Sequence, residues 1–463
     1  MREPRKPAKP RAAKTTRSKA ATLSKTVKAA KLKATRVTPK VKTAGVTQKV
    51  KAAATLRTPK LKIPPLKVPR PRNFKPLEVE VVPEGEDKLI RESVKLTFAL
   101  QERRKAAQKG EVLRGVHPKS HGCLIARFTV SPKLRKRNRV GIFAVPGRTF
   151  KAKIRLSNAS TSIAPDMDAG QNGSRGFAMK IMEAGKRALL KDQGAVNQDF
   201  LMINTPEFAF ANVADYHRAM LALMADPAGI DGAAYFLPAK LLQLGLMDPK
   251  GKLLRPRGEE PPELATLRAT FQHLATTPLF KDFGPVEMAG TLKSAQVLGK
   301  ILATTVRNPL EVGYFAASPV RFGPRRIARF SVEPLGGPVP QAPISPQEVE
   351  ALGPDFLAKA VAETMATGAA LTLRFKAQIM HPVELEGRSE LIEDATVAWD
   401  PEEFQPVELG KITIDPSDQP ADLVDACKTD RFSPWHCLPA HEPVGGINRL
   451  RKPVYETSAN HRG

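Results

Sequence analysis

Three short stretches of the chain contain side chains of the kinds that transfer protons and bind metals. Arg114-Gly-Val-His117 places a histidine three residues after an arginine, and an imidazole can accept and return a proton near neutral pH. Ile203-Asn204-Thr-Pro closes an apolar segment with an amide, which can hydrogen-bond a ligand without titrating. Arg451-Lys-Pro-Val-Tyr455 places an arginine one helical turn before a tyrosine, where its charge would favour the phenolate form that binds ferric iron.

Each of these residues also has a purely structural interpretation. A histidine in a polar turn is commonly a hydrogen-bonding surface residue, and Pro118 argues against the helix that would make His117 and His121 a metal-binding pair. Asn-Thr-Pro is a typical turn sequence, and an isolated tyrosine near a chain end often packs on the surface. Trp435-His436-Cys437 is interpreted as part of a buried cluster, because no further metal ligands lie at suitable spacing.

Taken together and in this order, the three stretches resemble the haem catalases. The resemblance implies that His117 and Asn204 are the catalytic residues on one face of a haem. His117 would move a proton from the near to the far oxygen of a peroxide, and Asn204 would orient that peroxide. It also implies that Tyr455 is the axial ligand of the haem iron on the opposite face, with Arg451 stabilising its phenolate.

The resemblance extends to residues that would bind the rest of the cofactor, an iron protoporphyrin. Arg155 and Arg462 match arginines that bind the haem propionates through charge-assisted hydrogen bonds. The related fatty-acid hydroperoxide isomerases tend to have a hydroxyl-bearing residue at the position of Val116, where the catalases have valine. The implied haem-binding residues are Arg114, Val116, Arg155, Ser157, Arg451, Tyr455 and Arg462.

Several departures point to a compact, catalase-related peroxidase branch of this superfamily. Leu156 replaces the aromatic residue that follows the propionate arginine, and Ala459 stands where many catalases have a histidine. The chain stops one residue after Arg462, so we expect no large helical extension or nicotinamide-binding region. The implied function is a haem-dependent hydroperoxidase that reduces hydrogen peroxide or organic hydroperoxides. A fatty-acid hydroperoxide isomerase on the same fold is the alternative enzyme.

Hydrophobic periodicity predicts strands, then helices, then strands again. Predicted strands cover 124–130, 140–145, 150–156, 176–182, 200–203, 312–315, 326–332 and 371–379, and predicted helices cover 88–109, 209–225, 262–276, 289–306, 347–366 and most of 449–463. This order predicts an α+β fold with a closed sheet and helices outside it. Periodicity does not distinguish a barrel from a sandwich, and the resemblance favours a catalase-like antiparallel β-barrel.

Positive charge is concentrated in the first 75 residues. Residues 1–75 contain 24 Lys or Arg and one acidic residue, whereas the other 388 residues contain 50 basic and 45 acidic residues. We predict a disordered Lys/Ala/Pro-rich basic tail over 1–75, because it has too little apolar surface to fold, and a catalase-like haem domain over 76–463. Such a tail would bind DNA or another polyanion without sequence preference. A nucleic-acid-associated protein is therefore the second functional hypothesis.

The cysteines and the lack of long apolar runs bear on the compartment. Cys123, Cys427 and Cys437 form a sparse, odd set without a Cys-x-x-Cys pair, which suits a reducing compartment and argues against a disulfide framework or a zinc site. No apolar run approaches 18 residues, and no signal-peptide core follows the basic N-terminus. We expect a cytoplasmic protein without a membrane span, associated with the nucleoid if the tail binds DNA. The resemblance is also compatible with an oligomer.

Overall fold

The computed structural model describes residues 80–107, 110–159, 163–167, 174–225, 233–256, 258–277, 279–280 and 283–462. The chain divides into two units, Met1–Leu56 and Arg57–Gly463. The first unit and the basic tail predicted over 1–75 lie outside the described residues, so the tail stays a prediction. Among the described helices, none is both long enough and apolar enough to cross a membrane.

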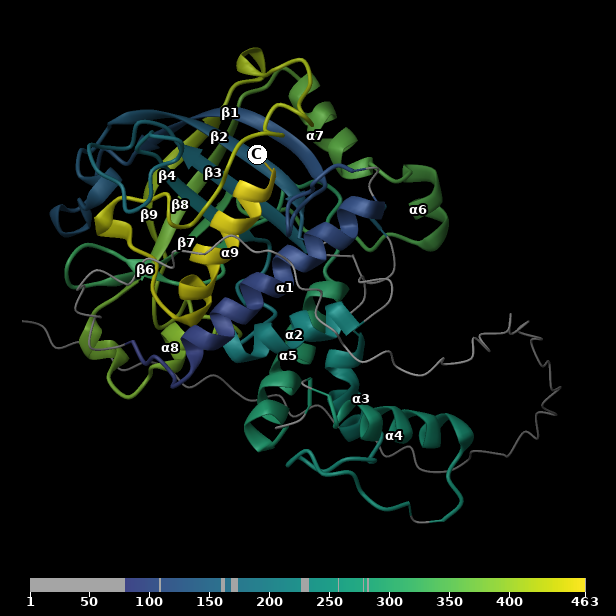
Figure 1. Ribbon diagram of the computed structural model, residues 1–463. Helices are drawn as coiled ribbons and strands as arrows, with labels where there is room; N and C mark the ends of the chain where they lie inside the picture. Colours follow the sequence, from purple (N-terminus) through teal and green to yellow (C-terminus); the bar gives the residue numbers. More distant parts are fainter. Residues whose placement is uncertain are drawn as a thin grey trace, which may run out of the picture. The chain divides into compact units, whose positions relative to one another are not determined.

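An antiparallel β-barrel forms the centre of the second unit (Figure 1). Within the described residues the strand order is β5-β4-β3-β2-β1-β9-β8-β7-β6, and an additional pairing of β5 with β7 closes eight strands into a ring. The short strand β6 pairs with β7 beside that ring. The strands are β1 (Ser120–Val130), β2 (Thr149–Asn158), β3 (Arg175–Ile181), β4 (Gln198–Ile203), β5 (Tyr314–Ala316), β6 (Val320–Arg321), β7 (Ile327–Pro334), β8 (Leu371–Met380) and β9 (Val407–Ile414).

Aromatic side chains fill the interior of the barrel. Phe128, Phe200, Phe330 and Phe375 come from four different strands, are buried, and contact one another with ring centroids 4.8 to 5.3 Å apart. Each such pair contributes about 0.5–1.5 kcal/mol beyond its buried area. Because successive side chains of a strand point to opposite faces, a strand with alternating apolar residues packs its apolar face into this core.

Helices surround the barrel (Figure 1). Helices α1 and α9 lie side by side and share a buried apolar cluster with α2, to which Val94, Val213 and Val454 belong. Proline occupies the first position of α4, α5 and α6, where its missing N–H costs no helical hydrogen bond. The helices are α1 (Glu86–Ala107), α2 (Val213–Ala225), α3 (Leu237–Gln243), α4 (Pro262–Leu274), α5 (Pro285–Ala303), α6 (Pro346–Leu352), α7 (Phe356–Ala366), α8 (Glu390–Glu393) and α9 (Gly446–Arg462).

The fold confirms most predicted elements and corrects some of them. The segment predicted as a strand over 140–145 contains a 3-10 turn, Gly141–Phe143, because Gly141 adopts a φ of +56°. The helix predicted over 347–366 is two helices, since Gly353 ends α6 with a φ of +80°. Hydrophobic periodicity did not predict β6, β9, α3 or α8, and α9 continues through Pro453.

The cysteine pattern argues against a disulfide framework, but the structure contains one disulfide. Cys123 in β1 and Cys427 in the connection after β9 form a disulfide across 304 residues of sequence, with their Cα atoms 5.6 Å apart, a separation typical of such bonds. Cys437 is buried and free. Cysteine spacing indicates only pairs that are close in sequence, whereas the fold brings this pair together across 304 residues.

Candidate functional site

A cavity of about 400 Å³ is lined by β2, β3, β4, the 114–117 segment and helices α1, α2, α5 and α9. Eight of the nine residues predicted for the site line this cavity: Arg114, Val116, His117, Arg155, Ser157, Arg451, Tyr455 and Arg462. The ninth, Asn204, is not among the lining residues. Segments up to 348 residues apart in the sequence therefore meet at one cavity, as the resemblance implied.

His117 is held in one orientation by two neighbouring strands. Its Nδ1 atom lies 3.1 Å from the Ser157 Oγ of β2. Beneath the ring is Gly176 of β3, where an added Cβ would lie only 2.4 Å from Nδ1. The backbone of His117 has a φ of +59°, which costs free energy in a non-glycine residue and persists only where the surroundings enforce it. The strand sequence thus leaves room for this imidazole.

The environment keeps His117 uncharged. Burial, followed by the positive charges of nearby arginines, Arg155 foremost, lowers the pKa of His117 to about 3. The imidazole is therefore uncharged from weakly acidic to basic pH, with one ring nitrogen as a hydrogen-bond donor and the other as an acceptor. It cannot serve as a resident positive charge.

Asn204 directly follows β4 and pairs with the start of β3. Its side-chain Oδ1 accepts a hydrogen bond of 2.6 Å from the backbone N–H of Arg175, and its backbone N–H donates to the Arg175 carbonyl at 3.1 Å. Its neighbours Leu201, Met202 and Ile203 line the cavity. The role in binding peroxide that the sequence predicts for this amide stays a prediction.

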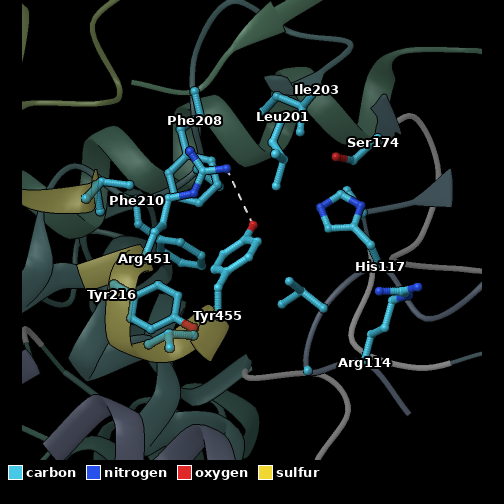
Figure 2. A pocket seen from close by; sticks show the side chains of 18 of the residues that line it. Arg114, His117, Ser174, Leu201, Ile203, Phe208, Phe210, Tyr216, Arg451 and Tyr455 are labelled. Carbon is cyan, nitrogen blue, oxygen red and sulfur yellow. Dashed lines mark hydrogen bonds between the residues drawn. The ribbon is translucent and has the colours of Figure 1, made fainter. Parts of the chain in front are cut away.

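Tyr455 and Arg451 form the opposite side of the cavity. Figure 2 shows the Tyr455 ring facing the side that carries His117, with open space between the two. The Arg451 Nη2 donates to the Tyr455 hydroxyl at 3.4 Å, and its guanidinium carbon lies 5.3 Å from the ring centroid. The other nitrogen of Arg451 donates to the Asn448 side chain at 3.2 Å. The four-residue spacing on α9 thus produces the contact that the sequence predicts.

Two further tyrosines, Tyr216 of α2 and Tyr235, line the same cavity and were not predicted. Burial raises the pKa of Tyr216 to about 12, so its phenol stays protonated. The Tyr455 hydroxyl accepts a hydrogen bond from Arg451. Tyr216 lies within the predicted apolar helix over 209–225, so its spacing alone could not separate a cavity residue from a core residue.

Three arginines form what we call the cationic end of the cavity: Arg114, Arg155 and Arg462. Burial and mutual repulsion lower the pKa of Arg114 to about 8 and that of Arg155 to about 10. Among the described residues, neither an Asp nor a Glu lines the cavity, and the buried Nε of Arg462 has no hydrogen-bond partner. This end of the cavity therefore favours a ligand with negative charge.

Backbone carbonyls of one loop hold Arg114 in place. Its Nη2 donates to the carbonyl oxygens of Cys427, Lys428 and Asp430 at 2.9, 3.0 and 2.8 Å. Arg462 donates to the same Lys428 carbonyl at 3.4 Å. Sequence reasoning missed this arrangement, because a backbone carbonyl leaves no mark on residue identity.

Three solved catalases have folds similar to that of this chain: a fungal catalase (TM-score 0.52, 14% identity), catalase A of Saccharomyces cerevisiae (0.51, 15%) and a bacterial catalase (0.52, 13%). Each superposition covers 78% of this chain and 59–62% of the catalase, so the chain spans about three fifths of those proteins. No protein-family profile matches the sequence, and no curated protein sequence is similar to it. The predicted catalase-like antiparallel β-barrel with surrounding helices is confirmed, and the chain has the catalase fold.

Proposed function

We propose that the protein is a haem-dependent hydroperoxidase of the compact, catalase-related kind, which reduces hydrogen peroxide or organic hydroperoxides. One observation carries the proposal. A single cavity joins a phenol that receives a hydrogen bond from an arginine, a neutral imidazole on the opposite side, and a cationic end. The catalase fold supports it at the level of architecture.

The residues present fit a haem. Tyr455 would bind the haem iron, and the guanidinium of Arg451 would stabilise its phenolate. The cationic end would bind the two propionates, which would supply the negative charge missing from the cavity lining. Apolar side chains of α2 and α5, such as Met220, Leu298 and Ile301, would contact the porphyrin. Bound in this way, haem would supply a redox-active iron for peroxide cleavage.

His117 is the proposed proton carrier. Because burial keeps the imidazole neutral, its free ring nitrogen could accept a proton from one oxygen of a bound peroxide and return it to the other oxygen. The hydrogen bond to Ser157 and the close approach of Gly176 hold the ring for this task. Asn204 is proposed to orient the peroxide through the donor end of its amide.

The test is an absorption titration of the purified full-length chain with ferric haem. We expect one high-spin ferric haem per chain with phenolate charge-transfer bands, and peroxide-dependent turnover of that complex. A chain that stays colourless after reconstitution would refute the proposal. Product analysis with a fatty-acid hydroperoxide separates the alternative enzyme, because an isomerase rearranges its substrate without consuming a reductant.

A second candidate function concerns the basic tail over residues 1–75. Its 24 basic residues against a single acidic one support non-specific binding to DNA or another polyanion, and we propose that this tail tethers the enzyme to such a partner. Deleting residues 1–75 should then abolish binding to duplexes of unrelated sequence. Unchanged DNA affinity after the deletion would refute the tether.

A further inference from the structure

The Cys123–Cys427 disulfide lies beside the cationic end of the cavity. It joins β1 to the 423–430 loop, which belongs to neither a helix nor a strand. In this loop Cys427 is buried, while Val424, Asp425 and Ala426 before it are exposed. The disulfide is therefore the covalent anchor of a segment that has little packing of its own.

The same loop supplies the acceptors of Arg114. The three carbonyls that receive its Nη2 belong to Cys427 itself and to the residues one and three positions later, Lys428 and Asp430. Hydrogen bonds to a charged donor are among the stronger ones in proteins. Because three acceptors converge on one nitrogen, a small movement of this backbone would release Arg114 from its present position.

Other contacts also hold the loop against the barrel. Leu423 packs against the main apolar core, and its carbonyl accepts from the backbone N–H of Cys123 at 2.6 Å. Lys153 forms a partly buried ion pair with Asp430 at 3.0 Å, whereas the ion pair of Lys428 with Glu111 at 3.3 Å is exposed and therefore weak in water. Inside the cavity, the positive charges of Arg155 and Arg462 repel Arg114, so its position depends on the loop.

We propose that the Cys123–Cys427 disulfide positions Arg114. It holds the 423–430 loop where the backbone carbonyls of the loop accept hydrogen bonds from Arg114. Reduction of the disulfide therefore weakens anion binding at the cationic end of the cavity. The identification of that anion as a haem propionate rests on the proposed function. Reduction by a dithiol breaks the S–S bond, adds one hydrogen to each sulfur and converts the dithiol into its own disulfide, so electrons and protons balance.

The first test compares haem with its dimethyl ester, whose carboxylates carry no charge. In the full chain, replacing both Cys123 and Cys427 with serine should lower the affinity for haem by roughly tenfold and leave the affinity for the ester unchanged. Cys437→Ser is the matched control and should change neither. If the loop had a merely structural role, the serine substitutions would lower the affinity for haem and for its ester alike, and that result would overturn the proposal.

A double-mutant cycle tests whether the disulfide acts through Arg114. Arg114→Gln alone should reproduce the loss for haem, and adding the two serine substitutions should cost little more. If Arg114→Gln and the two serine substitutions lowered the affinity for haem by independent factors that multiply, the disulfide would act by another route, and the proposal would be wrong.

A third measurement needs neither a variant nor a porphyrin. Reducing the wild-type disulfide should increase the reactivity of Arg114 toward an arginine-selective dicarbonyl, measured by peptide mass spectrometry, while the buried Arg329, far from this loop in sequence and held by other carbonyls, stays protected. Unchanged reactivity of Arg114 would overturn the proposal. If the wild type binds neither porphyrin, the proposed function fails, and this measurement still decides the role of the disulfide.

Discussion

The two sides of the cavity are built in different ways. The Tyr455 side is a single helix, and the contact between Arg451 and Tyr455 follows from a spacing of four residues on α9. The His117 side is assembled from β2, β3 and a segment in an unusual backbone conformation. A local contact survives changes elsewhere in the fold, whereas the His117 side depends on residues distant in sequence. Variants on the two sides should therefore fail differently.

Tyr455→Phe should have the largest effect, because it removes the proposed iron ligand. Haem should bind weakly or through water, and the phenolate charge-transfer bands should disappear from the absorption spectrum. Arg451→Ala keeps the phenol but removes the hydrogen bond at 3.4 Å, so we expect haem affinity to become more dependent on pH. Tyr216→Phe is the control in the same cavity and should keep the wild-type spectrum. A spectrum retained in Tyr455→Phe would place the ligand elsewhere.

His117→Ala should separate the two sides of the cavity. The variant should bind haem with a wild-type spectrum, since its ligand lies on α9, yet lose roughly 10²–10⁴-fold in peroxide turnover. Stopped-flow measurement of peroxide consumption by the haem complex checks this prediction. Wild-type turnover in the variant would show that another group carries the proton.

Gly176→Ala tests the assembly of the His117 side from separate strands. An added Cβ would lie 2.4 Å from His117 Nδ1 and 2.7 Å from Ser157 Oγ, so the imidazole must move. We expect turnover to fall by roughly tenfold or more and stability to fall by about 1–3 kcal/mol. Gly313→Ala is a matched control, because its Cβ would have ordinary contacts at 3.5 Å. Equal activity of the two variants would mean that His117 is not held as we infer.

These residues show which features of the fold and of the candidate site can be predicted from the sequence. The barrel, most elements and eight of the nine site residues at one cavity could be predicted, because motif order and local spacing are written in the chain. Gly176 lies within a strand that the sequence predicts. Its position under His117 depends on the register between β2 and β3, which the sequence does not show. The disulfide and the hydrogen bonds from Arg114 to the loop carbonyls join segments about 300 residues apart, and nothing in the local composition indicates these contacts.

Acid should destabilise the folded chain, and His117 should contribute to that loss together with His121 and His441, whose pKa values burial lowers to about 4. Burial lowers the pKa of His117 to about 3, below its usual value of 6.5. At pH values between these two, the unfolded chain binds a proton that the folded chain excludes. This contribution to stability is therefore complete above pH 6.5 and falls as the pH decreases toward 3, by at most about 1.4 kcal/mol per pH unit. Urea unfolding of the haem-free chain at pH 7.5 and 5.0 should show a smaller loss in His117→Gln than in wild type.

Asn204 should have the smallest effect of the residues predicted to be catalytic. Its Oδ1 is engaged with the Arg175 N–H at 2.6 Å, so Asn204→Ala removes a strand contact together with the proposed peroxide donor. We expect turnover to fall by roughly tenfold, the worth of one hydrogen bond in the transition state. Asn204→Asp discriminates between the two roles, because a carboxylate keeps the acceptor for Arg175 but has no N–H to donate. If the amide orients peroxide, Asp should be no more active than Ala. If Asp restores turnover, Asn204 closes the β3–β4 pairing and the His117 side performs its chemistry without it.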